Sequence, residues 1–83
     1  MQLTADISMY PLREDFIPPI DGFIEKIQQY DDLIVFRSPT STVVQGDYDY
    51  TMKAVQDTIA ACNKAFGLAV YVVKYIPEYQ ALD

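Results

Sequence analysis

Residues 40–50 read TSTVVQGDYDY, and this stretch decides the fold. The β-branched residues within 42–45 favour a strand, because their side chains suit a pleated surface. Gly46 is predicted to break that strand, and Asp47 carries a side chain that commonly caps a helix N-terminus. The stretch therefore predicts a strand that passes almost directly into a helix.

The predicted helix after Asp47 has apolar residues at alternating spacings of three and four, which form one stripe that should face a sheet. The stripe consists of Met52, Val55, Ile59, Cys62 and Phe66. Gly67 is predicted to end the helix, since glycine readily adopts the conformation that follows a helix C-terminus. Residues 68–76 then form a last strand that Pro77 closes. This strand is apolar on both faces, so we expect a second subunit to cover one of them.

The residues before the deciding stretch supply a strand, a helix and a short strand. Leu3 to Tyr10 alternates between apolar and polar residues, which is the pattern of a half-buried strand. A helix is expected to begin near Pro18, where the missing N–H has no partner to lose. Gly22 would cost that helix about 1 kcal/mol, so we expect another group to approach it closely. Residues 33–37 form the short strand.

This element order, β-α-β-β-α-β, predicts a single α+β domain over residues 1–83 with a ferredoxin-like fold. Right-handed crossovers place the four strands in an antiparallel sheet of order 4-1-3-2, with both helices on one face. The first and third strands are then neighbours. Tyr10 should lie near Ser41, and Asp6 near Gln45, to within a residue or two. The polar residues of the two strands should form one surface.

Composition excludes several classes of function. The formal charge is −6, the sequence pI is about 4.2, and six basic residues are scattered along the chain, which argues against a nucleic-acid partner. Without histidine and with one cysteine, the chain offers no Cys/His metal site and no intramolecular disulfide. No signal-like segment or membrane span is visible, so we expect a cytoplasmic protein without membrane insertion.

Catalysis is not expected, because the sequence has no recognisable nucleophile with its base and no glycine-rich phosphate motif. Asp47 and Asp49 could offer two oxygens to Mg²⁺, but a helix start accounts for both, so we predict no metal and no cofactor. Seven tyrosines, several hydroxyls and an acidic field suit a small flat heterocycle that is cationic or carries an amine. Any single tyrosine is nevertheless better explained by packing.

Two segments of the chain resemble the YkoF-related proteins, which bind thiamin and its hydroxymethylpyrimidine moiety. They are the strand end 8–12, SMYPL, and the segment 41–49, in which Ser-Thr is followed after three residues by Gly-Asp-Tyr-Asp. The resemblance spans about residues 5–77 and corresponds to a single-repeat member. It implies a non-catalytic binder of thiamin or hydroxymethylpyrimidine, active in vitamin uptake or handling, that assembles as a homodimer or homotetramer.

The resemblance also implies a set of ligand-binding residues, carried over by position. They are Ser8, Tyr10, Thr42, Gln45, Gly46, Asp47 and Tyr48. The apolar body of the pocket could come from Met9, Phe23, Met52 or Val55, each of which a core role also explains. We expect the ligand near Gly46 and Asp47 rather than at the turn 38–41. The alternative function is a ligand-free oligomerisation or regulatory module.

Overall fold

The computed structural model describes residues 1–82, and every expected element is present. In chain order the elements are β1 (Gln2–Pro11), α1 (Ile17–Ile27), β2 (Ile34–Arg37), β3 (Thr42–Asp47), α2 (Tyr48–Phe66) and β4 (Ala69–Pro77). The sheet is antiparallel throughout and has the order β2-β3-β1-β4, which is the predicted order read from the other edge. The ferredoxin-like prediction is therefore confirmed.

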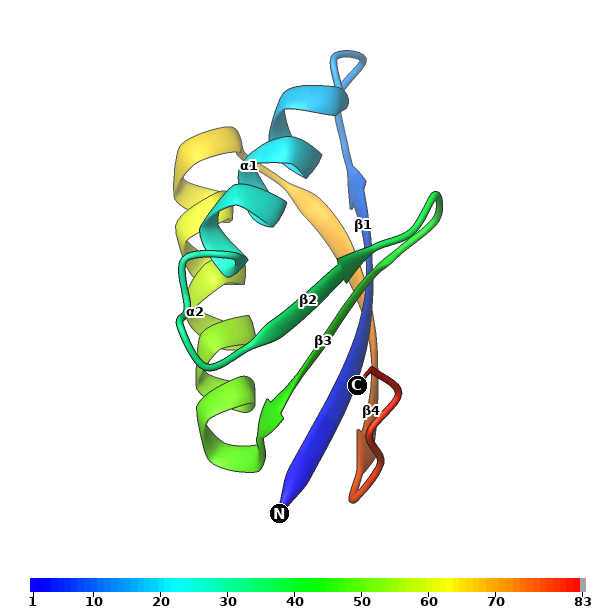
Figure 1. Ribbon diagram of the computed structural model, residues 1–83. Helices are drawn as coiled ribbons and strands as arrows, with labels where there is room; N and C mark the ends of the chain where they lie inside the picture. The colour runs from blue at the N-terminus through cyan, green and yellow to red at the C-terminus, as the bar shows by residue number, and fades with distance from the viewer. Residues whose placement is uncertain (83) are drawn as a thin grey trace.

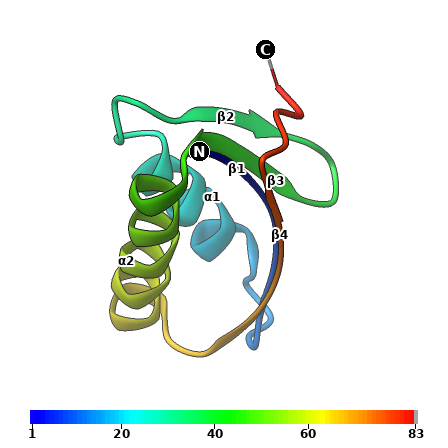
Figure 2. The ribbon, with the colours of Figure 1, turned by 90° about the horizontal axis from the view of Figure 1, so that it is seen from below.

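The two helices form one layer and the sheet forms the other (Figure 1). Seen along the sheet, the strands curve around the helix layer and leave the opposite face of the sheet without a covering helix (Figure 2). We call this opposite face the outer face. On β1, Leu3, Ala5 and Ile7 are buried against the helices, whereas Asp6 and Ser8 lie on the outer face, as the alternating pattern predicted.

The register between β1 and β3 differs from the prediction by two residues. Asp6 faces Val43, and Gln45 faces Thr4. The prediction that Gly46 breaks β3 is wrong, because Gly46 pairs with Leu3 and the ladder continues for one more residue. A Cβ on Gly46 would lie 2.8 Å from Leu33 Cδ2 and 2.9 Å from Thr51 Oγ1, so close packing explains this glycine.

The ends of the helices follow the sequence signals. Helix α1 has proline in its first turn, and the Asp47 carboxylate accepts a hydrogen bond from the Tyr50 N–H as the N-cap of α2. Gly67 ends α2 with a φ of 89°, a conformation that favours glycine. The close approach expected at Gly22 is present, since a Cβ there would lie 2.5 Å from the ring of Phe66.

Strand β4 forms one edge of the sheet and leaves apolar side chains on the outer face. Val70, Val72 and Ile76 are exposed there, together with Ile34 and Phe36 of β2. The last described residues, 79–82, fold back over this face and lie across the ends of β1 and β3 (Figures 1 and 2). Coverage of the rest of the outer face by another subunit remains a prediction.

Candidate functional site

A cavity of about 200 Å³ lies between the N-terminal half of α1, the second half of β1 and the turn that joins β2 to β3. Its apolar wall comes from the helix-facing side of β1 and from α1. The side chains that form this wall are Ile7, Met9, Phe16, Ile17, Ile20, Phe23 and Ile24. The elements that frame the cavity are fixed by core packing, because Ile7 and Phe23 are each 2% exposed.

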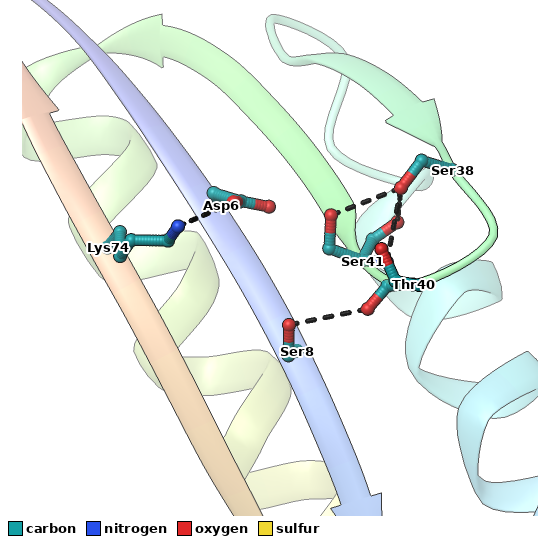
Figure 3. Close-up of polar contacts among 6 residues, drawn as sticks. All are labelled: Asp6, Ser8, Ser38, Thr40, Ser41 and Lys74. Carbon is teal, nitrogen blue, oxygen red and sulfur yellow. Dashed lines mark hydrogen bonds and ion pairs between the residues drawn. The ribbon is translucent and has the colours of Figure 1, made fainter.

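The other wall of the cavity consists of the turn from Ser38 to Ser41 together with Thr42, and apart from Pro39 each of these residues carries a hydroxyl. Ser38 makes this turn rigid: its hydroxyl lies 2.9 Å from the Ser41 carbonyl oxygen and 3.1 Å from the Ser41 Oγ, and it accepts a hydrogen bond from the Ser41 N–H (Figure 3). Ser8 donates a hydrogen bond of 3.3 Å to the Thr40 carbonyl from the outer face. Within residues 1–82, the hydroxyls of Thr40 and Thr42 take part in none of the hydrogen bonds and remain free to meet a ligand.

One ion pair bridges α1 and β2 at the cavity. Arg37 Nη2 lies 2.9 Å from Asp21 Oδ1, and both side chains are about half exposed. Arg37 faces the helix layer because it pairs with Thr42, which itself faces Ile7. Among the described residues that line the cavity, Arg37 is the one with a charged side chain.

Behind the cavity, the ring of Phe23 packs on Tyr71 of β4, with the ring centroids 5.9 Å apart. The Tyr71 hydroxyl is buried without a hydrogen-bond partner in the described structure. Burial raises the pKa of this phenol, and the nearby Cys62 raises it further, so Tyr71 stays neutral at physiological pH. The Tyr71 hydroxyl is thus a buried polar group that lies directly behind the Phe23 side chain of the apolar wall.

The structure does not bring the seven residues implied by the resemblance to one place. Thr42 lines the cavity, and Ser8 braces its turn from the other side of the sheet. Tyr10 and Gln45 lie on the outer face. Gly46, Asp47 and Tyr48 lie at the far end of β3, where the chain enters α2. Their assignment to a ligand remains a prediction that the cavity at the turn does not by itself support.

Three of these residues have structural roles, of which the helix cap of Asp47 was predicted from the sequence. Gln45 is only 3% exposed, and its side-chain oxygen accepts a hydrogen bond of 2.6 Å from the Leu82 N–H. Asp47 caps α2, and Gly46 allows close packing. The residues that sequence reasoning placed second, those of the turn 38–41, are the ones that line the cavity. Arg37 was missed, although a cation directly before a turn with three hydroxyl residues was a usable signal.

A second hollow lies open between α1 and α2 and has a larger volume, about 340 Å³. Its lining residues are Lys26, Gln29, Tyr30, Asp57, Thr58 and Ala61. It lacks an enclosing apolar wall, and Asp57 is already engaged by Lys53 at 2.9 Å. We therefore regard the smaller but more enclosed cavity as the candidate site, since ligand sites usually combine apolar walls with a few placed polar groups.

Within residues 1–82, no group of three or more aspartate, glutamate, histidine or cysteine side chains is arranged to hold a metal ion. No helix in this part of the chain is long and apolar enough to cross a membrane.

Comparison with known proteins finds similar proteins by structure alone. No protein-family model matches the chain, and no curated protein matches it. A protein of Streptococcus pneumoniae superposes with a TM-score of 0.86 and 20% identity, covering 95% of this chain and 89% of that one. A Thermotoga maritima protein, provisionally assigned to thiamine biosynthesis or salvage, superposes with a TM-score of 0.83 and 24% identity over 98% and 86% of the two chains.

A Bacillus cereus domain of unknown function gives a TM-score of 0.78 and 23% identity over 96% of this chain and 77% of that one. At such identities the likeness shows the fold.

Proposed function

We propose that the protein binds a small flat heterocycle in the cavity between α1 and the turn 38–41, without converting it, and that the ligand is thiamin or its hydroxymethylpyrimidine moiety. The observation that carries the proposal is the pairing of an apolar wall with a wall of hydroxyls. The likeness to a Thermotoga protein provisionally assigned to thiamine biosynthesis or salvage supports the choice of ligand.

The two walls suit the two parts of an aminopyrimidine, namely its flat ring faces and its polar edge. Its ring faces can pack against the half-buried Met9 and Ile20 of the apolar wall. The hydroxyls of Thr40 and Thr42 can exchange hydrogen bonds with ring nitrogens and the exocyclic amine, because a hydroxyl both donates and accepts. The volume of about 200 Å³ lies below the usual range for drug-sized ligands and suits a single ring.

The charge in the cavity refines this choice. The sequence suggested an acidic field that attracts a cation, yet none of the described side chains lining the cavity is a carboxylate, and Arg37 is positive. A neutral pyrimidine fits this lining better than the positively charged thiazolium ring of thiamin. We therefore expect thiamin to bind through its pyrimidine half, with the thiazolium ring outside the cavity. The proposal includes no catalytic step and a cytoplasmic location.

Calorimetric titration with hydroxymethylpyrimidine and thiamin tests the proposal. Both are expected to bind, and Thr42→Val should weaken binding of both about tenfold, because it removes a hydroxyl and keeps the shape of the side chain. Thr58→Val is the matched control, since Thr58 is equally buried but lies on α2 outside the cavity. Absence of heat with both compounds on the folded wild-type protein would overturn the proposal.

A second candidate function is favoured by the outer face. Val70, Val72 and Ile76 of β4 and Phe36 of β2 leave an apolar surface in the single chain, and such surfaces often mark protein–protein contacts. We propose that this face carries self-association into a homodimer or homotetramer, either alongside ligand binding or as the main role of a ligand-free module. A melting temperature that rises with hydroxymethylpyrimidine would separate the two roles, because the ligand-free module would show no rise.

A further inference from the structure

The charge distribution around the cavity points to a more specific ligand than the heterocycle alone. The chain as a whole carries −6, yet Arg37 is the one charged side chain among the described residues that line the cavity. Arg37 lines the cavity, and the Asp21 carboxylate holds it through only one terminal nitrogen of the guanidinium. The guanidinium has five N–H donors, so most of them are left for another acceptor.

The N-terminus of α1 borders the same cavity. Phe16 precedes the helix without a side-chain cap, and no acidic residue lies in the first turn. Helix N-termini carry a partial positive charge, which nearby acidic residues often offset. Phe16, Ile17 and Ile20 of this helix end line the cavity.

The hydroxyls of the turn complete a set of donors. Ser38 and Ser41 lock the turn through their mutual hydrogen bonds, and this places the free hydroxyls of Thr40 and Thr42 on the wall that Arg37 also borders. An arginine with several hydroxyls is a common way to hold a phosphoryl group, whose three terminal oxygens accept more hydrogen bonds than a carboxylate does.

We propose that the cavity selects a phosphorylated small heterocycle: the ring lies against the apolar wall, and the phosphate is held by Arg37 and the turn hydroxyls. In the unliganded protein, Asp21 is the exchangeable partner of Arg37, and the phosphate takes its place. This inference rests on the proposed function, since it concerns the same site, and it assigns Arg37 as the residue that determines specificity for the charged form.

The test compares three probes by calorimetric titration: hydroxymethylpyrimidine phosphate, hydroxymethylpyrimidine and inorganic phosphate. The phosphorylated pyrimidine is expected to bind at least about tenfold more tightly than the unphosphorylated one, in line with the usual strength of hydrogen bonds to charged groups. Inorganic phosphate alone should bind more weakly than the phosphorylated pyrimidine, because it leaves the apolar wall unfilled.

Two substitutions locate the effect. Arg37→Gln should remove the preference for the phosphorylated pyrimidine, so that the variant binds the two pyrimidines with equal affinity, and the variant should still fold, since an exposed ion pair contributes little to folding. Asp21→Asn should strengthen binding of the phosphorylated form, because the competing carboxylate is gone. Arg13→Gln is the matched control: Arg13 is also paired with an aspartate but does not line the cavity.

The outcomes separate the two proposals. Equal affinity for both pyrimidines, or a preference that survives Arg37→Gln, overturns the selection of a phosphate and leaves the binding of a heterocycle standing. Inorganic phosphate that binds as tightly as the phosphorylated pyrimidine also overturns it, since the ring would then play no part. If neither pyrimidine binds, this inference falls together with the proposed function.

Discussion

The ring of Phe66, at the end of α2, occupies the space next to Gly22 of α1, so that a Cβ on Gly22 would lie 2.5 Å from two of its ring carbons. This close approach fixes the distance between the two helices. Gly22→Ala should therefore destabilise the protein by about 1–3 kcal/mol through overpacking, although alanine alone would favour the helix by about 1 kcal/mol. Urea unfolding measures the change.

A double substitution checks the cause of that loss. Gly22→Ala combined with Phe66→Leu should cost less than the two single losses added together, because the smaller side chain relieves the overlap. Gly67→Ala serves as a comparison, since nothing lies within 4 Å of its Cβ and only its positive φ is strained. Strict additivity of the first two substitutions would show that Phe66 is not the obstacle.

Asp47 should contribute to folding rather than to binding. Asp47→Ala removes the carboxylate that accepts from the Tyr50 N–H at 3.3 Å and should cost about 0.5–2 kcal/mol. Asp49→Ala, in the same helical turn but outside that cap, should cost less. Affinity for hydroxymethylpyrimidine should be unchanged in both variants. A large loss of affinity in folded Asp47→Ala protein would instead move the ligand to the Gly46–Asp47 end of β3.

Thr4 should hold the C-terminal segment in place. Its hydroxyl donates to the Tyr79 carbonyl at 2.6 Å and accepts from the Ala81 N–H at 3.3 Å. Each such bond contributes about 1 kcal/mol, so Thr4→Val should speed hydrogen exchange of the Ala81 amide by about fivefold or more. Ser8→Ala, which removes a hydroxyl from the same face but not from the segment, should leave that exchange rate unaltered.

Self-association through the outer face should depend on Asp6 and Lys74. The two side chains are 3.6 Å apart, and the other carboxylate oxygen of Asp6 is buried without a partner in the described structure. In a two-fold pair, Lys74 of each copy can reach Asp6 of the other. Asp6→Lys and Lys74→Asp should each be monomeric in sedimentation velocity, and an equimolar mixture should form a heterodimer.

Lys53→Asp, on the helix side of the molecule, is the control and should associate like the wild type. A mixture of the two charge variants that stays monomeric while the wild type associates would assign the association to another surface.

Alkaline pH should destabilise the protein by way of Cys62. Burial raises the pKa of this thiol above its ordinary value of 9.0, although the nearby Lys26 lowers it in part. As the pH rises past that value, the unfolded chain loses the proton while the folded chain keeps it, so the free energy of unfolding falls. Urea unfolding at neutral and alkaline pH should show this fall, and Cys62→Ala should reduce it. An equal fall in both proteins would assign it to Tyr71 and Tyr75, whose pKa values burial also raises.

The fold was predictable because each local signal agreed with the topology. Short local stretches of sequence are enough to predict the alternation on β1, the helix cap at Asp47 and the end of α2 at Gly67. The continuation of β3 through Gly46 was not predictable in this way. It depends on Leu33 and Thr51, which approach Gly46 only after the sheet and helix have packed.

The candidate site was predicted only in part, because the pattern of side chains along the sequence does not show where the folded chain will leave a cavity. Thr42 was expected and lines the cavity. Gln45 looked equally suitable, yet the chain covers it with Leu82, a contact between residues 37 positions apart. Arg37 forms an ion pair with Asp21 across the space between β2 and α1, and no pattern within either segment indicates that pairing.

The segment 79–82 is held through its main-chain groups, since Thr4 and Gln45 meet a carbonyl and two amides rather than side chains. Its own side chains therefore contribute little to holding it, and its amino-acid identities should drift freely in evolution provided that its main-chain groups keep these contacts. For protein engineering, the same property makes this segment a suitable place for an affinity tag or a library of displayed peptides. Such additions would leave the cavity at the other end of the sheet undisturbed.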